Sequence, residues 1–158
     1  MNALVLYDSQ YGNTERIAQA IADALGPGGQ ARAVRVAKET PCSLEGIDLL
    51  IMGCPTQGWR PTLAIQSFLE HVEDGAWSGL AAAAFDTRFR GPRLLTGSAA
   101  QRIAQSLQKK GCSLLLPAES FFVKGTEGPL QDGEIERPAK WAGLVHQAYQ
   151  GAAGEVRK

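Results

Sequence analysis

Apolar residues along the chain follow two alternating patterns. Continuous apolar runs of about the length of a short strand predict strands buried on both faces of a sheet. The predicted strands are residues 3–7, 31–37, 48–54, 80–85 and a last one, interrupted around Pro117, that covers 112–116 and 121–123. The second of them carries Arg32 and Arg35, which suit an edge strand better than a central one.

Helical periodicity separates these runs. Residues 14–25 repeat apolar side chains at Ile17, Ile21 and Leu25, and similar patterns predict helices from Pro61, from Ser98 and from Pro138. The residues from Ser98 to Gln101 have the spacing of a capping box, so we expect that helix to begin there. We expect the residues from 151 onward to be frayed.

Strands that alternate with helices predict an α/β fold of three layers, with a doubly wound parallel sheet covered on both faces. The chain has 158 residues, which indicates one domain over residues 1–150 and a short tail at 151–158. In such sheets a ligand lies beyond the carboxyl ends of the strands, at the switch point beside the first one. Three loops, residues 9–14, 55–60 and 86–93, are predicted to meet there.

The first of these loops is suited to a phosphate. It leads from the first strand into the start of a helix, where backbone N–H groups lack partners and the helix dipole is positive. Ser9 and Thr14 add hydroxyl groups, Asn13 adds an amide, and Gly12 permits close approach of the backbone. Because no Lys or Arg lies between Asp8 and Glu15, we expect a phosphate monoester. The alternative is that Asn13 or Thr14 only caps the helix.

The sequence from Ser9 to Thr14 resembles the phosphate loop of the flavodoxin family, whose pattern is Ser/Thr-x-Thr-Gly-x-Thr. Tyr11 replaces the middle hydroxyl residue. The resemblance extends over nearly the whole chain and implies a five-stranded sheet in the order 2-1-3-4-5. It also implies that the loop binds the phosphate of FMN.

If the phosphate lies on the first loop, the flavin ring should lie between the second and third. The string from Gly53 to Gly58 resembles the family's second loop, and Gly58 matches the glycine whose peptide flips to meet the flavin N5 hydrogen. Trp59 and Phe89 are candidates for stacking on the ring. The residues expected to bind FMN are Ser9, Gln10, Tyr11, Gly12, Asn13, Thr14, Pro55, Thr56, Gln57, Gly58, Trp59, Asp86, Thr87, Arg88 and Phe89.

Arginines near the predicted ring site depart from the acidic surroundings that are usual in the family. Arg60, Arg88 and Arg90 near the ring would stabilise the anionic reduced flavin and raise the second-electron potential. They could equally form a solvated basic rim that selects acidic electron-transfer partners.

Composition limits the remaining possibilities. The formal net charge is zero, which argues against nucleic acid or an anionic membrane as the main partner. No apolar run approaches the length of a membrane span, and no signal-peptide pattern is present. Three cysteines without metal-ligand spacing suggest reduced thiols in a cytoplasm. We also expect a monomer. Its partners would be redox proteins: a flavin or ferredoxin reductase as donor and an oxidoreductase as acceptor.

Other functions remain open at this point. Cys54 and Arg60 have the Cys-x5-Arg spacing of cysteine-dependent phosphatases, although Pro55 removes one N–H from the loop. A regulatory receiver domain would use Asp8, Thr87 and Lys124, but the third strand ends without a phosphoacceptor carboxylate. An FMN-dependent NAD(P)H:quinone reductase shares the phosphate loop, and steady NAD(P)H oxidation would distinguish it from an electron carrier.

Overall fold

The computed structural model describes residues 1–27 and 30–158. Its sheet has the order β2-β1-β3-β4-β5, β6 also pairs with β4, and every pair is parallel. This is the predicted order, with the interrupted last strand divided in two. The strands are β1 (Ala3–Tyr7), β2 (Ala31–Arg35), β3 (Leu49–Pro55), β4 (Ala81–Phe89), β5 (Ser113–Leu114) and β6 (Glu119–Val123).

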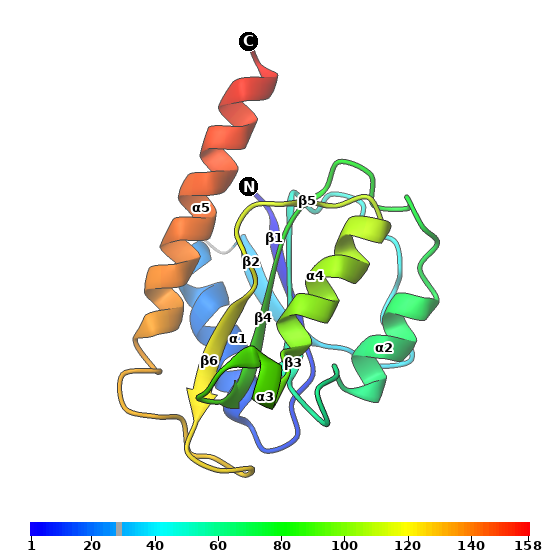
Figure 1. The fold of residues 1–158 in the computed structure, drawn as a ribbon. Helices are drawn as coiled ribbons and strands as arrows, with labels where there is room; N and C mark the ends of the chain where they lie inside the picture. The colour runs from blue at the N-terminus through cyan, green and yellow to red at the C-terminus, as the bar shows by residue number, and fades with distance from the viewer. Residues whose placement is uncertain (28–29) are drawn as a thin grey trace.

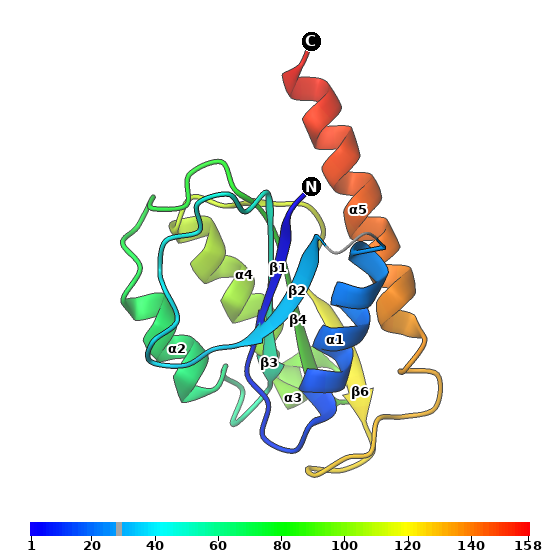
Figure 2. The same cartoon turned by 180° about the vertical axis from the view of Figure 1, so that it is seen from behind.

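Helices cover both faces of the sheet (Figures 1 and 2). The first and last helices pack on one face, and the second and fourth pack on the other. The helices are α1 (Asn13–Leu25), α2 (Leu63–Glu70), α3 (Arg93–Thr96), α4 (Ala99–Lys109) and α5 (Arg137–Val156). The predicted three-layer α/β architecture is confirmed.

Side chains of the central strands point alternately to the two faces of the sheet, so the hydrophobic core has two parts. Val5 points to the side of α1 and α5, where it packs with Ile21 and Trp141, whereas Leu6 points to the side of α2 and α4. Gly53 in β3 is needed for packing on the first side, because a Cβ there would lie 2.3 Å from the Phe85 ring. The two cores fix the central strands, and these strands position the loops at their ends.

The fourth strand was predicted but is longer than expected. It begins with four alanines, which favour helix by propensity, yet it forms a strand because β3 supplies a full set of pairing partners. It then continues to Phe89, where the sequence predicted a loop. The residues from Asp86 to Phe89 pair with β6, so they belong to the sheet.

Three smaller features complete the comparison. The one-turn helix α3 lies within the stretch predicted to be a loop. Ser98 caps α4 and accepts a hydrogen bond from the Gln101 N–H, as the capping-box spacing predicted. Helix α5 continues through Val156, so the expected fraying does not begin at residue 151; this end of the helix extends beyond the sheet (Figure 1).

Candidate functional site

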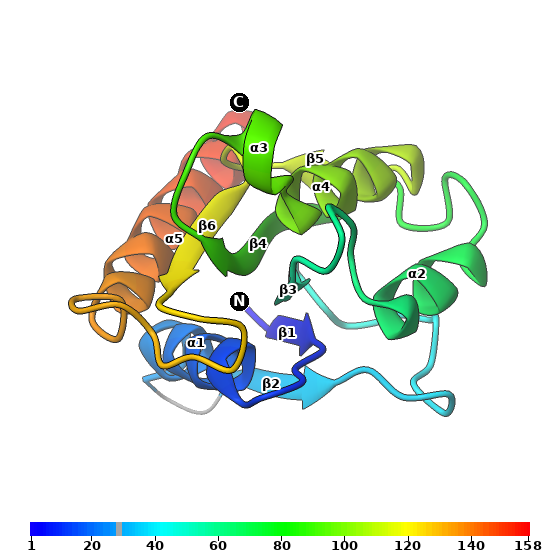
Figure 3. The ribbon, with the colours of Figure 1, turned by 60° about the horizontal axis from the view of Figure 1, so that its bottom comes forward.

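The three loops that the sequence predicted to meet do so at the carboxyl ends of the strands (Figure 3). They enclose a cleft of about 100 Å³. The cleft is lined by Ser9, Gln10, Tyr11, Asn13, Thr14, Pro55, Thr56, Gln57, Thr87, Arg88, Phe89, Thr96, Val123 and Thr126. Its position at the switch point between β1 and β3 is the place where parallel sheets of this kind bind ligands.

The first loop forms a turn that ends at the start of α1. Gly12 adopts a left-handed conformation with φ 89°, which only glycine takes readily. The buried Ser9 hydroxyl accepts hydrogen bonds from the N–H groups of Gly12 (3.1 Å) and Glu15 (3.3 Å). Among the described residues, nothing accepts from the N–H groups of Tyr11, Asn13 or Thr14. These donors stay available to an anion at the helix start.

Hydroxyl and amide side chains join the first loop to its neighbours. The buried hydroxyl groups of Thr14 and Thr87 lie 2.8 Å apart, which links α1 to β4. The Asn13 amide donates to the carbonyl of Glu127 at 3.2 Å, so the loop after β6 lies against the helix start. No lysine lines the cleft, and the hydroxyl and amide side chains of the first loop are neutral. Two arginines lie close by: Arg88 lines the cleft, and the Arg35 guanidinium donates to the Ser9 carbonyl.

Aromatic side chains border the same cleft. Tyr11 from the first loop and Phe89 from the end of β4 both line it, and both are about half exposed. An exposed aromatic face beside a polar cleft suits a flat ring system that is only partly enclosed.

The second loop contains a tight turn from Gln57 to Arg60, closed by hydrogen bonds of 2.9 and 3.0 Å between their backbones. Gly58 (φ 53°) and Trp59 (φ 73°) both have positive φ, as the central residues of a type I′ turn do. For Trp59 this conformation is strained. The Trp59 side chain packs against Gly97, where a Cβ would lie 2.6 Å from the Trp59 Cα. Trp59 therefore faces α3 and α4, and it is not among the residues that line the cleft.

Asp86 is fully buried beneath the cleft, in contrast to the expectation that it contacts a cofactor. Its Oδ2 atom accepts hydrogen bonds from the Ser98 hydroxyl (2.7 Å), the Ala100 N–H (3.0 Å) and the Thr56 hydroxyl (3.1 Å). The carboxylate thus lies at the positive start of α4 and fixes the second loop against it. Its role is to position the loops.

Arg88 is also a structural residue. Its side chain is buried, Nε donates to Ser120 at 2.8 Å, and Nη1 donates to the Gly91 carbonyl and the Thr96 hydroxyl. Burial lowers the pKa of its guanidinium, and the nearby Asp86 carboxylate at 3.9 Å opposes that shift. Arg88 lines the cleft as predicted, but its side chain is buried and its guanidinium is hydrogen-bonded within the protein, so it does not belong to an exposed basic rim. Arg90 likewise lies over the Phe122 ring, 5.0 Å from its centre.

Most of the residues predicted to form the site line the cleft. The exceptions are Gly12, Gly58, Trp59 and Asp86. Sequence reasoning missed Thr96, Val123 and Thr126, which also line it. Thr96 belongs to α3, whose four residues give too little periodicity to be predicted. Val123 and Thr126 follow the break in the last strand, and the pairing of β6 with the end of β4 brings them to the cleft.

The phosphatase hypothesis fails on the geometry of its cysteine. Cys54 is fully buried in β3, and burial raises the pKa of its thiol to about 12. A cysteine nucleophile needs an exposed thiolate, so Cys54 cannot fill that role at neutral pH.

The receiver-domain residues are also engaged elsewhere. Asp8 accepts from the Ser9 N–H and the Arg35 guanidinium, and Lys124 pairs with Asp132 at 3.3 Å. The third strand ends at Gly53, Cys54 and Pro55, without a carboxylate to accept a phosphoryl group.

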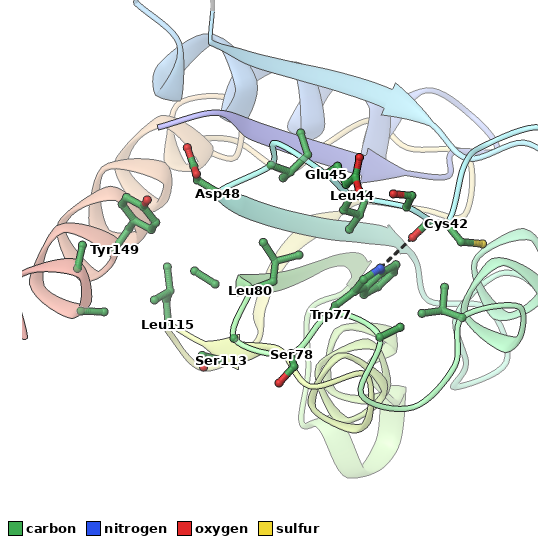
Figure 4. A pocket seen from close by; sticks show the side chains of 18 of the residues that line it. Cys42, Leu44, Glu45, Asp48, Trp77, Ser78, Leu80, Ser113, Leu115 and Tyr149 are labelled. Atoms are coloured by element: carbon green, nitrogen blue, oxygen red, sulfur yellow. Dashed lines mark hydrogen bonds between the residues drawn. The ribbon is translucent and has the colours of Figure 1, made fainter. Parts of the chain in front are cut away.

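A larger hollow of about 1160 Å³ lies at the opposite, amino-terminal ends of the strands (Figure 4). The Trp77 indole closes part of it by donating to the Cys42 carbonyl at 2.9 Å, and Tyr149 from α5 lies across from it. Within residues 1–27 and 30–158, no group of three metal-ligating side chains is placed to hold an ion, and no helix is long and apolar enough to cross a bilayer.

Solved structures share this arrangement. Oxidised flavodoxin 2 from Bacillus cereus superposes with a TM-score of 0.77 at 21% identity, over 93% of this chain and 99% of the other. Oxidised flavodoxin 1 from the same organism superposes with a TM-score of 0.75 at 20% identity, over 93% of this chain and 98% of the other. A flavodoxin, WrbA-like protein from Agrobacterium tumefaciens superposes with a TM-score of 0.72 at 20% identity, over 94% of this chain and 98% of the other. At these identities the superpositions show the fold.

The family itself is shown by the sequence model for flavodoxin, which matches residues 5–141. That match spans β1 to the start of α5 and so contains all three loops of the cleft. The chain therefore belongs to the flavodoxin family.

Proposed function

We propose that this chain binds FMN non-covalently in the cleft and carries electrons between redox partner proteins. The observation that supports this most strongly is the set of unused N–H groups at the start of α1, beside Ser9 and Thr14. A phosphate monoester would accept from these N–H groups and from the nearby hydroxyls without any metal ion.

The remaining residues of the cleft suit the ribityl chain and the ring of FMN. Thr56, Gln57 and Thr87 offer polar groups for a hydroxylated chain, and Tyr11 and Phe89 offer aromatic surface for a flavin ring at the mouth. Bound FMN would supply the acceptance and release of electrons, while the protein would bind it and set its environment. We assign no substrate turnover to the protein's own side chains.

The three cysteines form no disulfide within the described residues, and we expect this carrier to act in the reducing cytoplasm. A monomer that exchanges partners fits the role. The donor would be a flavin or ferredoxin reductase and the acceptor an oxidoreductase.

The test is spectroscopic. The purified chain is incubated with FMN, freed of excess flavin by gel filtration and scanned for absorption. We expect a yellow protein with about one flavin per chain. It should cycle between oxidised and reduced forms with dithionite and air, without steady oxidation of NAD(P)H. A colourless protein after gel filtration would refute FMN binding, and steady NAD(P)H consumption would favour the reductase alternative.

A further inference from the structure

The charges of this chain are strongly segregated along the sequence, although their sum is zero. From Thr87 to Ala118 there is no Asp or Glu, whereas Arg88, Arg90, Arg93, Arg102, Lys109 and Lys110 are basic. This stretch forms the end of β4, α3, α4 and β5. Within the described residues, Arg88 and Lys110 pair with Asp86 and Asp74, whereas Arg93, Arg102 and Lys109 form no ion pair and leave unpaired positive charge next to the cleft.

Several of these basic groups converge on one surface with apolar side chains. Trp59, Arg93, Leu94 and Arg102 line a hollow of about 500 Å³ between the second loop, α3 and α4. Arg60 and Arg102 line an adjoining hollow of about 400 Å³. We call Trp59, Arg60, Arg93, Leu94 and Arg102 the arginine patch.

The charges of the arginine patch are available for binding. Arg60, Arg93 and Arg102 are exposed, and none of them forms an ion pair with a carboxylate in the described part of the chain. Within residues 1–27 and 30–158, the Arg93 guanidinium donates only to the Ala118 carbonyl. The adjoining hollow also contains two acidic residues: Asp74, which is paired with Lys110 at 2.9 Å, and Glu70, which forms no ion pair within the same residues.

The apolar part of the patch is unusually open. Leu94 is 80% exposed and Trp59 is 50% exposed, and Trp59 is held there in a strained conformation with φ 73°. Exposed apolar side chains surrounded by arginines form the composition that protein interfaces favour, with aromatic and arginine side chains at the centre.

The patch adjoins the cleft directly. Helix α3 contributes Thr96 to the cleft and Arg93 and Leu94 to the patch. The second loop likewise contributes Gln57 to the cleft and Trp59 to the patch. A protein bound on the patch would therefore lie beside the cleft, close to the place where a carrier has to exchange electrons.

From this charge pattern and position we propose that the arginine patch docks an electron-transfer partner whose own contact surface is acidic around an apolar centre. This deepens the proposed function and rests on it. Opposite charges across the interface would steer the encounter, and the Trp59 and Leu94 side chains would supply the buried contact.

The test uses two labelled helical peptides that share one leucine stripe and carry either glutamate or lysine on the flanking positions. Binding to the full chain, with and without FMN, is followed by fluorescence anisotropy. We expect the glutamate peptide to bind at least tenfold more tightly than the lysine peptide at about 0.05 M salt, and to lose most of that preference at about 0.5 M.

Variants locate the contact. The double variant Arg93→Glu with Arg102→Glu should bind the glutamate peptide at least tenfold more weakly. The variant Leu94→Ser should also bind this peptide more weakly, without any change of charge. The control, Lys38→Glu with Lys140→Glu, makes the same change of net charge at exposed residues outside the patch and should alter the affinity less than twofold.

Four results would overturn the proposal: equal binding of both peptides, equal loss in the control, no binding at all, or tighter binding to phosphatidylserine vesicles or to a single-stranded oligonucleotide. FMN affinity is measured separately on each variant. Bound FMN without peptide binding refutes only the docking surface, whereas selective peptide binding to a chain that does not bind FMN supports the surface and refutes the carrier function.

Discussion

Replacing Asp86 with alanine tests how the structure holds its site together. The carboxylate is fully buried, accepts from Ser98, Ala100 and the half-buried Thr56, and lies 3.9 Å from the buried Arg88 guanidinium. Removal leaves these donors without their acceptor and leaves a buried cation without its nearest anion. Removal of one partner from a buried ion pair costs about 3–5 kcal/mol.

The expected loss in free energy of unfolding corresponds to a lower midpoint temperature of unfolding. For a chain of 158 residues, 1 kcal/mol corresponds to about 2–4 °C in the midpoint of unfolding, so a loss of about 4 kcal/mol predicts about 8–16 °C. The measurement is thermal unfolding followed by circular dichroism. The second readout is FMN affinity, which should fall although Asp86 does not line the cleft, because Thr56 loses its anchor.

The matched control is Asp74→Ala. Asp74 also pairs with a basic residue, Lys110 at 2.9 Å, but its side chain is 75% exposed, and such pairs add little to stability. We expect no measurable shift. The reasoning would be refuted if the two variants unfolded at the same temperature, or if Asp86→Ala unfolded within about 3 °C of the parent.

Further predictions concern the core, the thiols and acid stability. Gly53→Ala forces a Cβ into the Phe85 ring and should cost about 1–3 kcal/mol in urea unfolding; an unchanged midpoint would contradict the packing. Iodoacetamide should modify the partly exposed Cys42 well before the buried Cys54, whose thiol pKa is about 12, as peptide mass mapping would show; faster reaction of Cys54 would be contrary to its burial. Burial opposes ionisation of Glu134, but Arg137 and the Phe122 N–H outweigh it and lower the pKa of that carboxyl. The ionised Glu134 carboxylate therefore stabilises the fold above its unfolded pKa of ~4.3, and this stabilisation is lost as the pH falls through the lower folded pKa. The difference in free energy of unfolding between the parent and Glu134→Gln should therefore shrink in acid. Urea midpoints between about pH 3 and 6 measure that difference, and a constant difference would count against the linkage.

The outline of the fold could be predicted because its signals are local. The apolar run of β1, the polar loop after it and the periodicity of α1 each lie within a few neighbouring residues. The strand of four alanines could also be assigned from its length and from the turns around it, although its propensity favoured helix.

What the sequence could not show depends on contacts between distant segments. Asp86 and Arg88 look like loop residues because they are charged, yet their partners lie at Ser98 and Ser120, far along the chain. A charge that is satisfied inside the protein cannot be distinguished from a free one until those partners are placed. The structure is therefore needed to distinguish the buried Arg88 from the exposed arginines of the arginine patch.

The proposed binding of FMN depends most on a phosphate group held by neutral donors at the start of α1, and a comparison of two flavins tests this directly. FMN and riboflavin share the ring and the hydroxylated chain and differ only in the phosphate. Quenching of their fluorescence on titration with the purified chain gives both affinities under the same conditions. We predict that FMN binds at least a hundredfold more tightly than riboflavin, about 2.7 kcal/mol, since no described residue accepts from the N–H groups beside Ser9 and Thr14. Equal affinities, or no quenching of either flavin, would contradict the account.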